Sequence, residues 1–388
     1  MHIVFVTAFF TENERNPLTG MPGYIYKISN FLVLRGHQVE IVAGARYNKK
    51  WIYKGITIYN CKIPEILNRG TFENSFKILQ REKVFQSKLK ELDRSLPIDV
   101  VQYAGWSGVG LLHSLKCPGV LRISTYSCVQ YKESEILKNT GCLSFWERMA
   151  GIHADGILSP SNVLGDKFGY DIRKKVVLME TPYNDSIIED SKLYDTKLEG
   201  KKYLLFFGQT SREKGFQVIQ DMMPRFMETY KDFWFVVAGW NSPQAGSDAI
   251  SILKCKLGKY ENHFMFLGPV SQTQLYPIIR NAVCVLIPSL IDNLPNACLE
   301  ALFLGQVVVG TYGTSIEQMI QNNFNGFLVE PGDSKALLEM VFKVCALRDH
   351  ERRHMIKNSR KILKRYSPEY AVAKLEKYYR WIIRHKMG

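Results

Sequence analysis

Short apolar runs alternate along the chain with longer segments whose apolar residues recur every three or four positions. The short runs are rich in β-branched residues, as is typical of buried strands, and the longer segments have the spacing of amphipathic helices. Strands that alternate with helices predict an α/β fold with parallel sheets. We expect strands near 2–8, 39–42, 56–59, 99–103, 119–125, 152–161, 174–178, 203–207, 233–239, 264–270, 283–287, 307–309 and 326–329, and helices near 23–34, 72–92, 271–280, 297–303, 333–347, 351–366 and 367–384.

One opening pattern occurs in both halves of the chain. A strand, a glycine-containing loop and a helix follow residue 2, and the same order follows residue 203. This order is typical of nucleotide-binding folds. A chain of 388 residues is long enough for two domains with separate cores. We expect one domain at 1–182, a second at 183–365 and a final helix at 366–388.

The stretch from Asn281 to Pro331 carries the densest chemistry. A buried strand ends at Pro288, a polar loop follows, and a helix runs from Ala297 to Phe303, with Asn296 as its expected N-cap. Ligands of parallel sheets bind beyond the carboxyl ends of the strands, beside helix N-termini that favour anions. Two acids, Asp292 and Glu300, are spaced eight residues apart across this loop and helix.

This stretch resembles the nucleotide-sugar site of glycosyltransferase family 4, a large family of retaining enzymes. The family carries two acids at this spacing, usually both Glu, and here they are Asp292 and Glu300. The Asn-Leu-Pro-Asn loop at 293–296, the helix, the later Gly-Thr and Glu317 also fall where the family has them. The resemblance covers nearly the whole chain, is strongest over 204–331 and is weaker between 46 and 96.

The resemblance implies the GT-B fold, in which two Rossmann-like domains have parallel sheets that face a central cleft. Residues 1–182 would then form an acceptor-binding domain, and residues 183–365 would form the nucleotide-sugar domain. The helix at 366–388 would cross back onto the first domain. The donor would be a nucleotide-diphosphate sugar, with UDP as the expected nucleotide, and the family implies neither a cofactor nor a metal.

Site roles follow from the same resemblance, position by position. Lys214 would bind the donor diphosphate, and Arg212 would add the charge that the family draws from an Arg where this chain has Gln209. Glu300 would accept hydroxyls of the ribose, and Asp292 would hold those of the sugar. The residues implied in catalysis are Asp292, Lys214 and Arg212, and those implied in donor binding are Gly20, Gly208, Lys214, Asn293, Leu294, Pro295, Asn296 and Glu300.

The chain departs from the family pattern in its first half as well. The usual Gly-Gly of the first loop is Thr19-Gly20, where a glycine lets backbone N–H groups approach a phosphate. A His that the family associates with the reacting end of the sugar is Ser124. Serine can supply a hydrogen bond but no group that titrates near neutral pH.

Charge and composition indicate the kinds of partner and the cellular compartment that we expect for the protein. The net charge of +14 suits anionic partners, and residues 351–388 contribute twelve Lys or Arg against three Glu, together with four Tyr and one Trp. A basic, aromatic helix is typical of membrane surfaces, although a solvated face with packed aromatics fits the pattern equally well. No apolar run reaches eighteen residues, and the N-terminus lacks the features of a signal peptide. The eight scattered cysteines suggest reduced thiols in a cytoplasmic protein.

We therefore expect a retaining, metal-independent hexosyltransferase of cell-surface polysaccharide synthesis. It would transfer a sugar from a UDP-sugar to a glycan or polyprenyl-lipid acceptor at the inner face of the cell membrane. A front-face reaction needs no protein nucleophile, which agrees with Ser124. A nucleotide-sugar epimerase or phosphorylase on the same fold and a non-catalytic partner subunit stay open as alternatives. Nucleic-acid binding would satisfy the charge but has no motif here.

Overall fold

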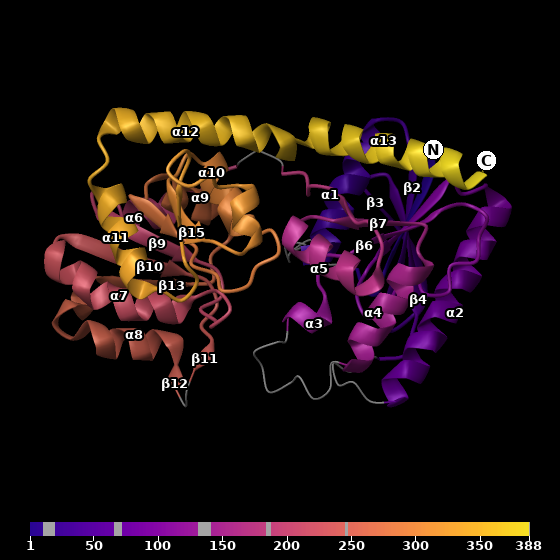
Figure 1. Cartoon of the computed structure of the whole chain (residues 1–388), viewed down its shortest axis with the longest axis horizontal. Coiled ribbons are helices and arrows are strands. Elements are labelled where there is room, and N and C mark those ends of the chain that lie inside the picture. The colour runs from indigo at the N-terminus through magenta and orange to yellow at the C-terminus, as the bar shows by residue number, and fades with distance from the viewer. Residues whose placement is uncertain (11–19, 66–71, 131–140, 184–187, 245–246, 388) are drawn as a thin grey trace. The chain divides into compact units, whose positions relative to one another are not determined.

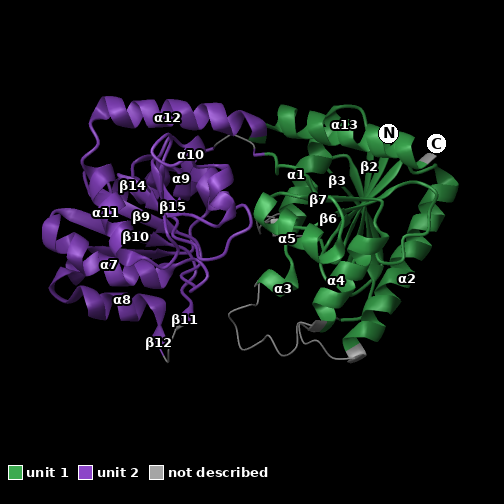
Figure 2. Cartoon of the chain, in the orientation of Figure 1, with its two compact units in different colours: residues 1–182, 366–388 green, residues 183–365 purple. Residues whose placement is uncertain are grey.

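The computed structural model describes residues 1–10, 20–65, 72–130, 141–183, 188–244 and 247–387 (Figure 1). The chain divides into two compact units, coloured separately in Figure 2. Unit 1 consists of Met1–Pro182 and Tyr366–Gly388, and unit 2 consists of Tyr183–Arg365. The chain thus leaves unit 1 once and returns to it with its last helix.

Unit 1 is built on an eight-stranded sheet with the order β3-β4-β2-β1-β5-β6-β7-β8. Its neighbouring strands are parallel except for β3 and β4, which pair antiparallel at one edge. The elements of unit 1 are β1 (His2–Thr7), α1 (Gly20–Leu34), β2 (Gln38–Ala45), β3 (Lys49–Tyr53), β4 (Ile56–Lys62), α2 (Phe72–Ser95), β5 (Val100–Ala104), β6 (Gly119–Arg122), α3 (Ser127–Gln130), α4 (Gly141–His153), β7 (Gly156–Ser159), α5 (Asn162–Ile172), β8 (Val177–Leu178) and α13 (Pro368–Met387).

Helices cover both faces of this sheet, as the alternation of side chains along β1 shows. Ile3 and Phe5 lie in a core with residues of α1 and α13. Val4 and Val6, which point to the opposite face, lie in a core with residues of α2, α4 and α5. The sheet is therefore buried on both sides, which explains why its central strands read as continuous apolar runs.

Unit 2 is built on a six-stranded sheet with the order β13-β10-β9-β14-β15-β16, whose neighbouring strands are all parallel. One face packs on α7, α8 and α11 through a core that includes Leu204, Phe216 and Leu337. The elements of unit 2 are α6 (Lys192–Lys197), β9 (Lys202–Phe207), α7 (Phe216–Thr229), β10 (Phe233–Ala238), β11 (Pro243–Gln244), β12 (Ser247–Asp248), α8 (Ala249–Leu257), β13 (Phe264–Gly268), α9 (Gln272–Arg280), β14 (Cys284–Leu286), α10 (Asn296–Phe303), β15 (Val308–Thr311), β16 (Phe327–Val329), α11 (Ser334–Cys345) and α12 (Asp349–Leu363).

The predicted α/β class with parallel sheets is confirmed, but one strand was not predicted and another has different bounds. The segment at 49–53 forms the antiparallel edge strand β3, which the apolar pattern did not indicate. The strand expected at 152–161 is shorter, because residues up to His153 belong to α4 and β7 spans only Gly156–Ser159. All eight cysteines are free, and no helix among the described residues is long and apolar enough to cross a bilayer.

A cluster of charged side chains fastens α13 to the rest of unit 1. Glu376 accepts two hydrogen bonds from Arg35, each 2.8 Å long, and one of 2.6 Å from the Nε2 of His37. Glu376 and His37 are buried, whereas Arg35 is half-exposed, so solvent screens part of its attraction. The hydrogen bonds from Arg35, ahead of those from His37, hold the pKa of Glu376 below its usual range.

Replacing this carboxylate should loosen α13. We expect Glu376→Gln to lower the free energy of unfolding by about 2 kcal/mol, since it leaves buried donors with a weaker acceptor. This corresponds to a fall of about 4–8 °C in Tm for a unit of this size, measured by calorimetry. Because the folded pKa is depressed, this stabilisation is present above the ordinary carboxyl pKa of about 4.3 and is lost as the pH falls further. The difference from wild type should therefore shrink in acid.

Glu369→Gln makes the same chemical change on an exposed part of α13 and serves as the control. Only a small loss is expected there, from the weaker interaction of the first turn with the helix dipole. Equal losses in the two variants would show that the cluster around Glu376 does not hold the helix.

Candidate functional site

The first loop of the candidate site follows β9 and touches the end of β14. Gly208 leaves the strand with φ 132°, and Gly215 closes the loop with φ 70°. A Cβ atom on Gly215 would lie 1.8 Å from the carbonyl oxygen of Pro288, so this position requires glycine. The contact brings the N-terminus of α7, which begins at Phe216, against the carboxyl end of β14, the strand that pairs with β9.

Asp292 sits at the meeting point of these two loops. Its Oδ2 accepts a hydrogen bond of 2.7 Å from the Nζ of Lys214 and one of 3.0 Å from the hydroxyl of Ser289. Its Oδ1 accepts one of 2.9 Å from the N–H of Asn293. The side chain of Asp292 is only 8% exposed, whereas that of Lys214 is 39% exposed. The carboxylate is therefore held in place, and the ammonium group is accessible.

The end of β15 and the loop after it form hydrogen bonds with the loop that carries Asp292, which follows the neighbouring strand β14. Thr311 donates to the carbonyl of Ser289 at 2.6 Å, and the hydroxyl of Ser315 donates to the carbonyl of Asp292 at 3.1 Å. The Oγ of Ser315 also accepts the N–H of Leu294. Leu294 has φ 60°, a left-handed conformation that leucine rarely adopts, and these hydrogen bonds and its burial stabilise it there.

Helix α10 carries the second predicted acid. It begins at Asn296, so the prediction that Asn296 is the N-cap was wrong: the cap is Pro295, which makes no side-chain capping bond. Glu300 lies one turn inside the helix and accepts a hydrogen bond of 3.0 Å from Gln272, which begins α9. This hydrogen bond fixes Glu300 to the first residue of α9, directly after the loop that follows β13.

Of the two predicted cations, Lys214 contacts the Asp292 carboxylate and Arg212 does not. Lys214 is bound to Asp292, whereas Arg212 and Gln209 lie exposed in the same loop. Arg212 contributes its backbone carbonyl to the turn that ends in Gly215. The loop thus presents a fixed cation and an adjacent exposed one beside the N-terminus of α7, an arrangement suited to an anion. Within the described ranges, no group of three His, Cys, Asp or Glu is placed to hold a metal ion.

The remaining sequence-predicted positions belong to unit 1. Gly20 is the first residue of α1, and its neighbour Thr19 lies outside the described residues. Ser124 follows β6 and donates a hydrogen bond to the sulfur of Met21 at 3.9 Å. The start of α1 and the end of β6 therefore lie together.

Several residues of the cluster escaped the sequence prediction. Ser289 and Ser315 hold Asp292, yet hydroxyl residues after strands are too common to single out. Trp240 follows β10 and is 70% exposed, which is unusual for so large an apolar side chain. Its carbonyl accepts the N–H of Thr210, so it is fixed to the loop that carries Lys214. In the sequence, the available signal was a tryptophan directly after the glycine that ends an apolar run, at the position where strand-end ligand sites lie.

Parts of the chain are similar to known proteins. Residues 190–362 match the family described as Glycosyl transferases group 1. Among curated proteins, the chain is similar to the 2-deoxystreptamine N-acetyl-D-glucosaminyltransferase of Niallia circulans, with 24% identity over 149 residues, or 38% of this chain and 37% of that protein. The alignment thus spans less than half of the relative's length.

Two solved structures share the fold over almost the whole chain. The sucrose-phosphate synthase of Thermosynechococcus elongatus superposes with a TM-score of 0.79, covering 99% of this chain and 100% of that one at 14% identity. Anabaena HepE, solved in complex with UDP, superposes with a TM-score of 0.67, covering 97% and 99% at 13% identity.

These structural matches confirm the predicted GT-B fold, and the family match spans nearly all of unit 2. The loops around Asp292 and Lys214 lie inside residues 190–362, the segment of this chain that matches the group 1 glycosyl transferases.

Proposed function

We propose that this protein is a retaining hexosyltransferase that moves a sugar from a UDP-sugar to a glycan or lipid-linked acceptor in cell-surface polysaccharide synthesis. The observation that carries the proposal is the contact between Lys214 and Asp292 at the carboxyl ends of neighbouring strands, with Glu300 on the following helix. The choice of UDP draws support from the related fold of HepE, which was solved with UDP.

In this mechanism, positive charge stabilises the leaving diphosphate. Lys214 is accessible on one side while Asp292 holds it on the other, so its ammonium group can bind phosphate without moving far. The N–H groups at the start of α7 and the guanidinium of Arg212 add to the same field. Fixed charges of this kind lower the barrier because they need no reorganisation as the leaving group becomes more negative.

The two acids would bind opposite ends of the donor. Glu300, fixed by Gln272, would accept hydroxyls of the ribose, and Asp292 would accept hydroxyls of the transferred sugar beside the backbone of Asn293. The acceptor hydroxyl would attack the anomeric carbon on the face from which the diphosphate departs. The departing phosphate would take the acceptor proton, so the configuration is retained without a protein nucleophile or metal.

A nucleotide panel tests the donor first. We expect UDP to raise the Tm in a thermal-shift assay without Mg²⁺, and to do so more than GDP, ADP or dTDP, because ligand binding to the folded state stabilises it. A larger shift with another nucleotide would reassign the base. If no nucleotide stabilises the protein, the result would favour a non-catalytic partner subunit. The replacement of the family Arg by Gln209 and of the family His by Ser124 would then explain the lack of donor binding.

Single substitutions test the site itself. Lys214→Ala and Glu300→Ala should each lower kcat/KM for the donor by about 100-fold or more, the usual cost of removing one group that stabilises a transition state. Lys231→Ala and Glu228→Ala are matched controls, since both residues are exposed in unit 2 away from these loops. Folded variants of Lys214 and Glu300 that keep full activity would refute the site.

We also propose that α13 brings the protein to an anionic membrane surface, where a lipid-linked acceptor would lie. Tyr366 and Tyr379 are buried, which accounts for part of the aromatic pattern. The outer face of the helix nevertheless exposes Lys377, Arg380 and Arg384 beside Trp381, whose side chain is half-exposed. Each basic residue near such a surface contributes about 1 kcal/mol of attraction.

Vesicle binding tests this surface. Replacing Lys377, Arg380 and Arg384 together by Gln should weaken binding to phosphatidylglycerol vesicles about 100-fold, with little binding of either protein to phosphatidylcholine. The same change at Lys83, Lys90 and Arg94, exposed basic residues of α2, removes equal charge elsewhere. If both triple variants lose affinity equally, net charge rather than α13 is responsible.

A further inference from the structure

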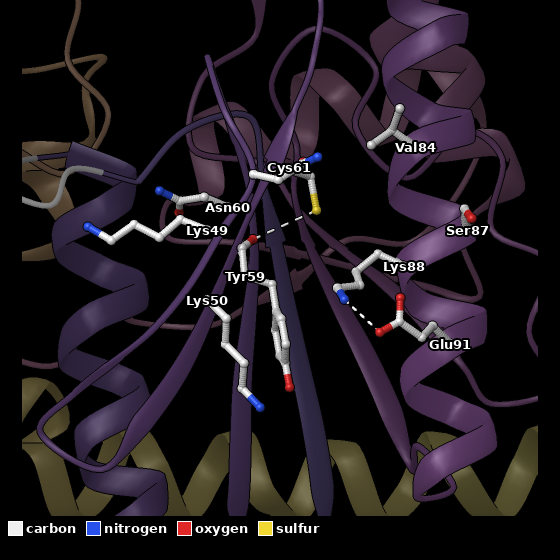
Figure 3. A pocket seen from close by; sticks show the side chains of 10 residues that line it. Lys49, Lys50, Tyr59, Asn60, Cys61, Val84, Ser87, Lys88 and Glu91 are labelled. Carbon is white, nitrogen blue, oxygen red and sulfur yellow. Dashed lines mark hydrogen bonds and ion pairs between the residues drawn. The ribbon is translucent and has the colours of Figure 1, made fainter.

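A pocket separate from the Lys214 and Asp292 cluster lies in unit 1, between helix α2 and two strands of the sheet, the edge strand β3 and its neighbour β4 (Figure 3). Its volume is about 550 Å³, within the range of sites that hold small ligands. Lysine side chains reach it from both sides, Lys50 from β3 and Lys88 from α2, whereas the side chain of Lys49, which precedes Lys50 on the strand, points to the opposite face of the sheet. The antiparallel pairing that the sequence pattern did not predict is therefore what forms one of its walls.

An aromatic ring organises the positive charge of this pocket. Tyr59 pairs directly with Lys50 across the two strands. The Nζ of Lys50 lies 5.4 Å from the centre of the Tyr59 ring, and the Nζ of Lys88 lies 4.6 Å from it. Figure 3 shows the two ammonium groups to either side of the ring. The two ammonium groups are thus within about 10 Å of each other, a distance comparable to the Debye length at moderate salt. Dissolved ions therefore screen their repulsion only in part.

The acids nearby only partly balance this charge. Among the described residues that line the pocket, Glu91 is the one acid; its Oε1 lies 2.8 Å from the Nζ of Lys88, and its side chain is 68% exposed. An exposed pair of this kind contributes little, so an incoming anion can displace Glu91 at low cost. Glu40 accepts the hydroxyl of Tyr59 at 3.1 Å but is itself bound to His2. Lys50 and Lys88 against Glu91 leave this side of the pocket with a charge of +1.

Neutral polar groups complete the lining. Asn48 comes from the strand side and Ser87 from the helix side, and both carry groups that form hydrogen bonds with hydroxyls. Tyr59 adds an apolar surface of the kind that packs against a ring. Positive charge, hydroxyl partners and an aromatic side chain in one cavity are the requirements of an anionic sugar rather than of a bare ion or an apolar molecule.

We propose that this pocket binds a sugar that carries a phosphate or a carboxylate. The anionic group would bind Lys50 and Lys88 and relieve their mutual repulsion, while the ring would lie against Tyr59. The pocket belongs to unit 1, whereas the Lys214 cluster belongs to unit 2, and its lining includes none of the donor-site residues. The inference therefore does not depend on the proposed transfer reaction.

Calorimetric titration of the whole 388-residue chain tests the pocket. The titration uses Lys214→Ala, so that phosphate binding at the other cluster does not contribute. We expect glucose 6-phosphate or glucuronate to bind more tightly than glucose and more tightly than inorganic phosphate. The further double change Lys50→Gln with Lys88→Gln should weaken that binding at least about tenfold, because each lost charge-assisted hydrogen bond is worth more than a neutral one.

Lys90→Gln is the matched control, because Lys90 is an exposed lysine of the same helix that does not line the pocket. Preferential binding of either anionic sugar, lost in the double variant and kept in Lys90→Gln, supports the proposal and identifies which anionic group is preferred. Equal binding to the double variant, no binding of either sugar, or inorganic phosphate binding as tightly would overturn it. Phosphatidylglycerol vesicles that bind through Lys50 and Lys88 when neither sugar does would instead assign the lysines to a lipid surface.

Discussion

The buried carboxylate of Asp292 is the interaction on which the organisation of the unit 2 site depends. It joins the loop after β9 through Lys214 and the loop after β14 through Ser289 and Asn293. A buried charge is stable only when donors surround it, and three separate donors do so here. The parallel pairing of β9, β14 and β15 brings these loops to one edge, and the glycine at position 215 lets them touch.

A carboxylate also organises unit 1, but its role there is structural. Glu376 ties α13 to residues that follow α1, more than 300 positions earlier in the chain. This contact explains how a chain that has already left unit 1 completes one face of its sheet with its last helix. The same helix has two different sides as a result, since its buried side provides core residues and its basic side remains in solvent.

Much of this arrangement follows from local sequence, because apolar runs and caps report on nearby residues. Most strands of both sheets followed from the apolar pattern, and the choice of Lys214 and Asp292 as site residues followed from the resemblance, but the ion pair between them did not. Strand β3 did not, since Lys49–Tyr53 carries two lysines and is only partly buried at an edge. Ser315 did not either, because its role depends on β15 lying beside β14, a register that no local signal encodes. Long-range partners such as Arg35 and Glu376 are hidden for the same reason.

The order of charges in the unit 2 site has a consequence for donor binding. Asp292 alone would repel a diphosphate, and in a partly buried site that repulsion would be weakly screened. With Lys214 bound to its outer side, the carboxylate instead fixes a cation at the surface where the phosphate would arrive. The ammonium group can then interact with both, and its attraction to the phosphate grows as the bond to the sugar breaks. Asp292 would thus favour departure of the leaving group through the ammonium group of Lys214 that it holds in place.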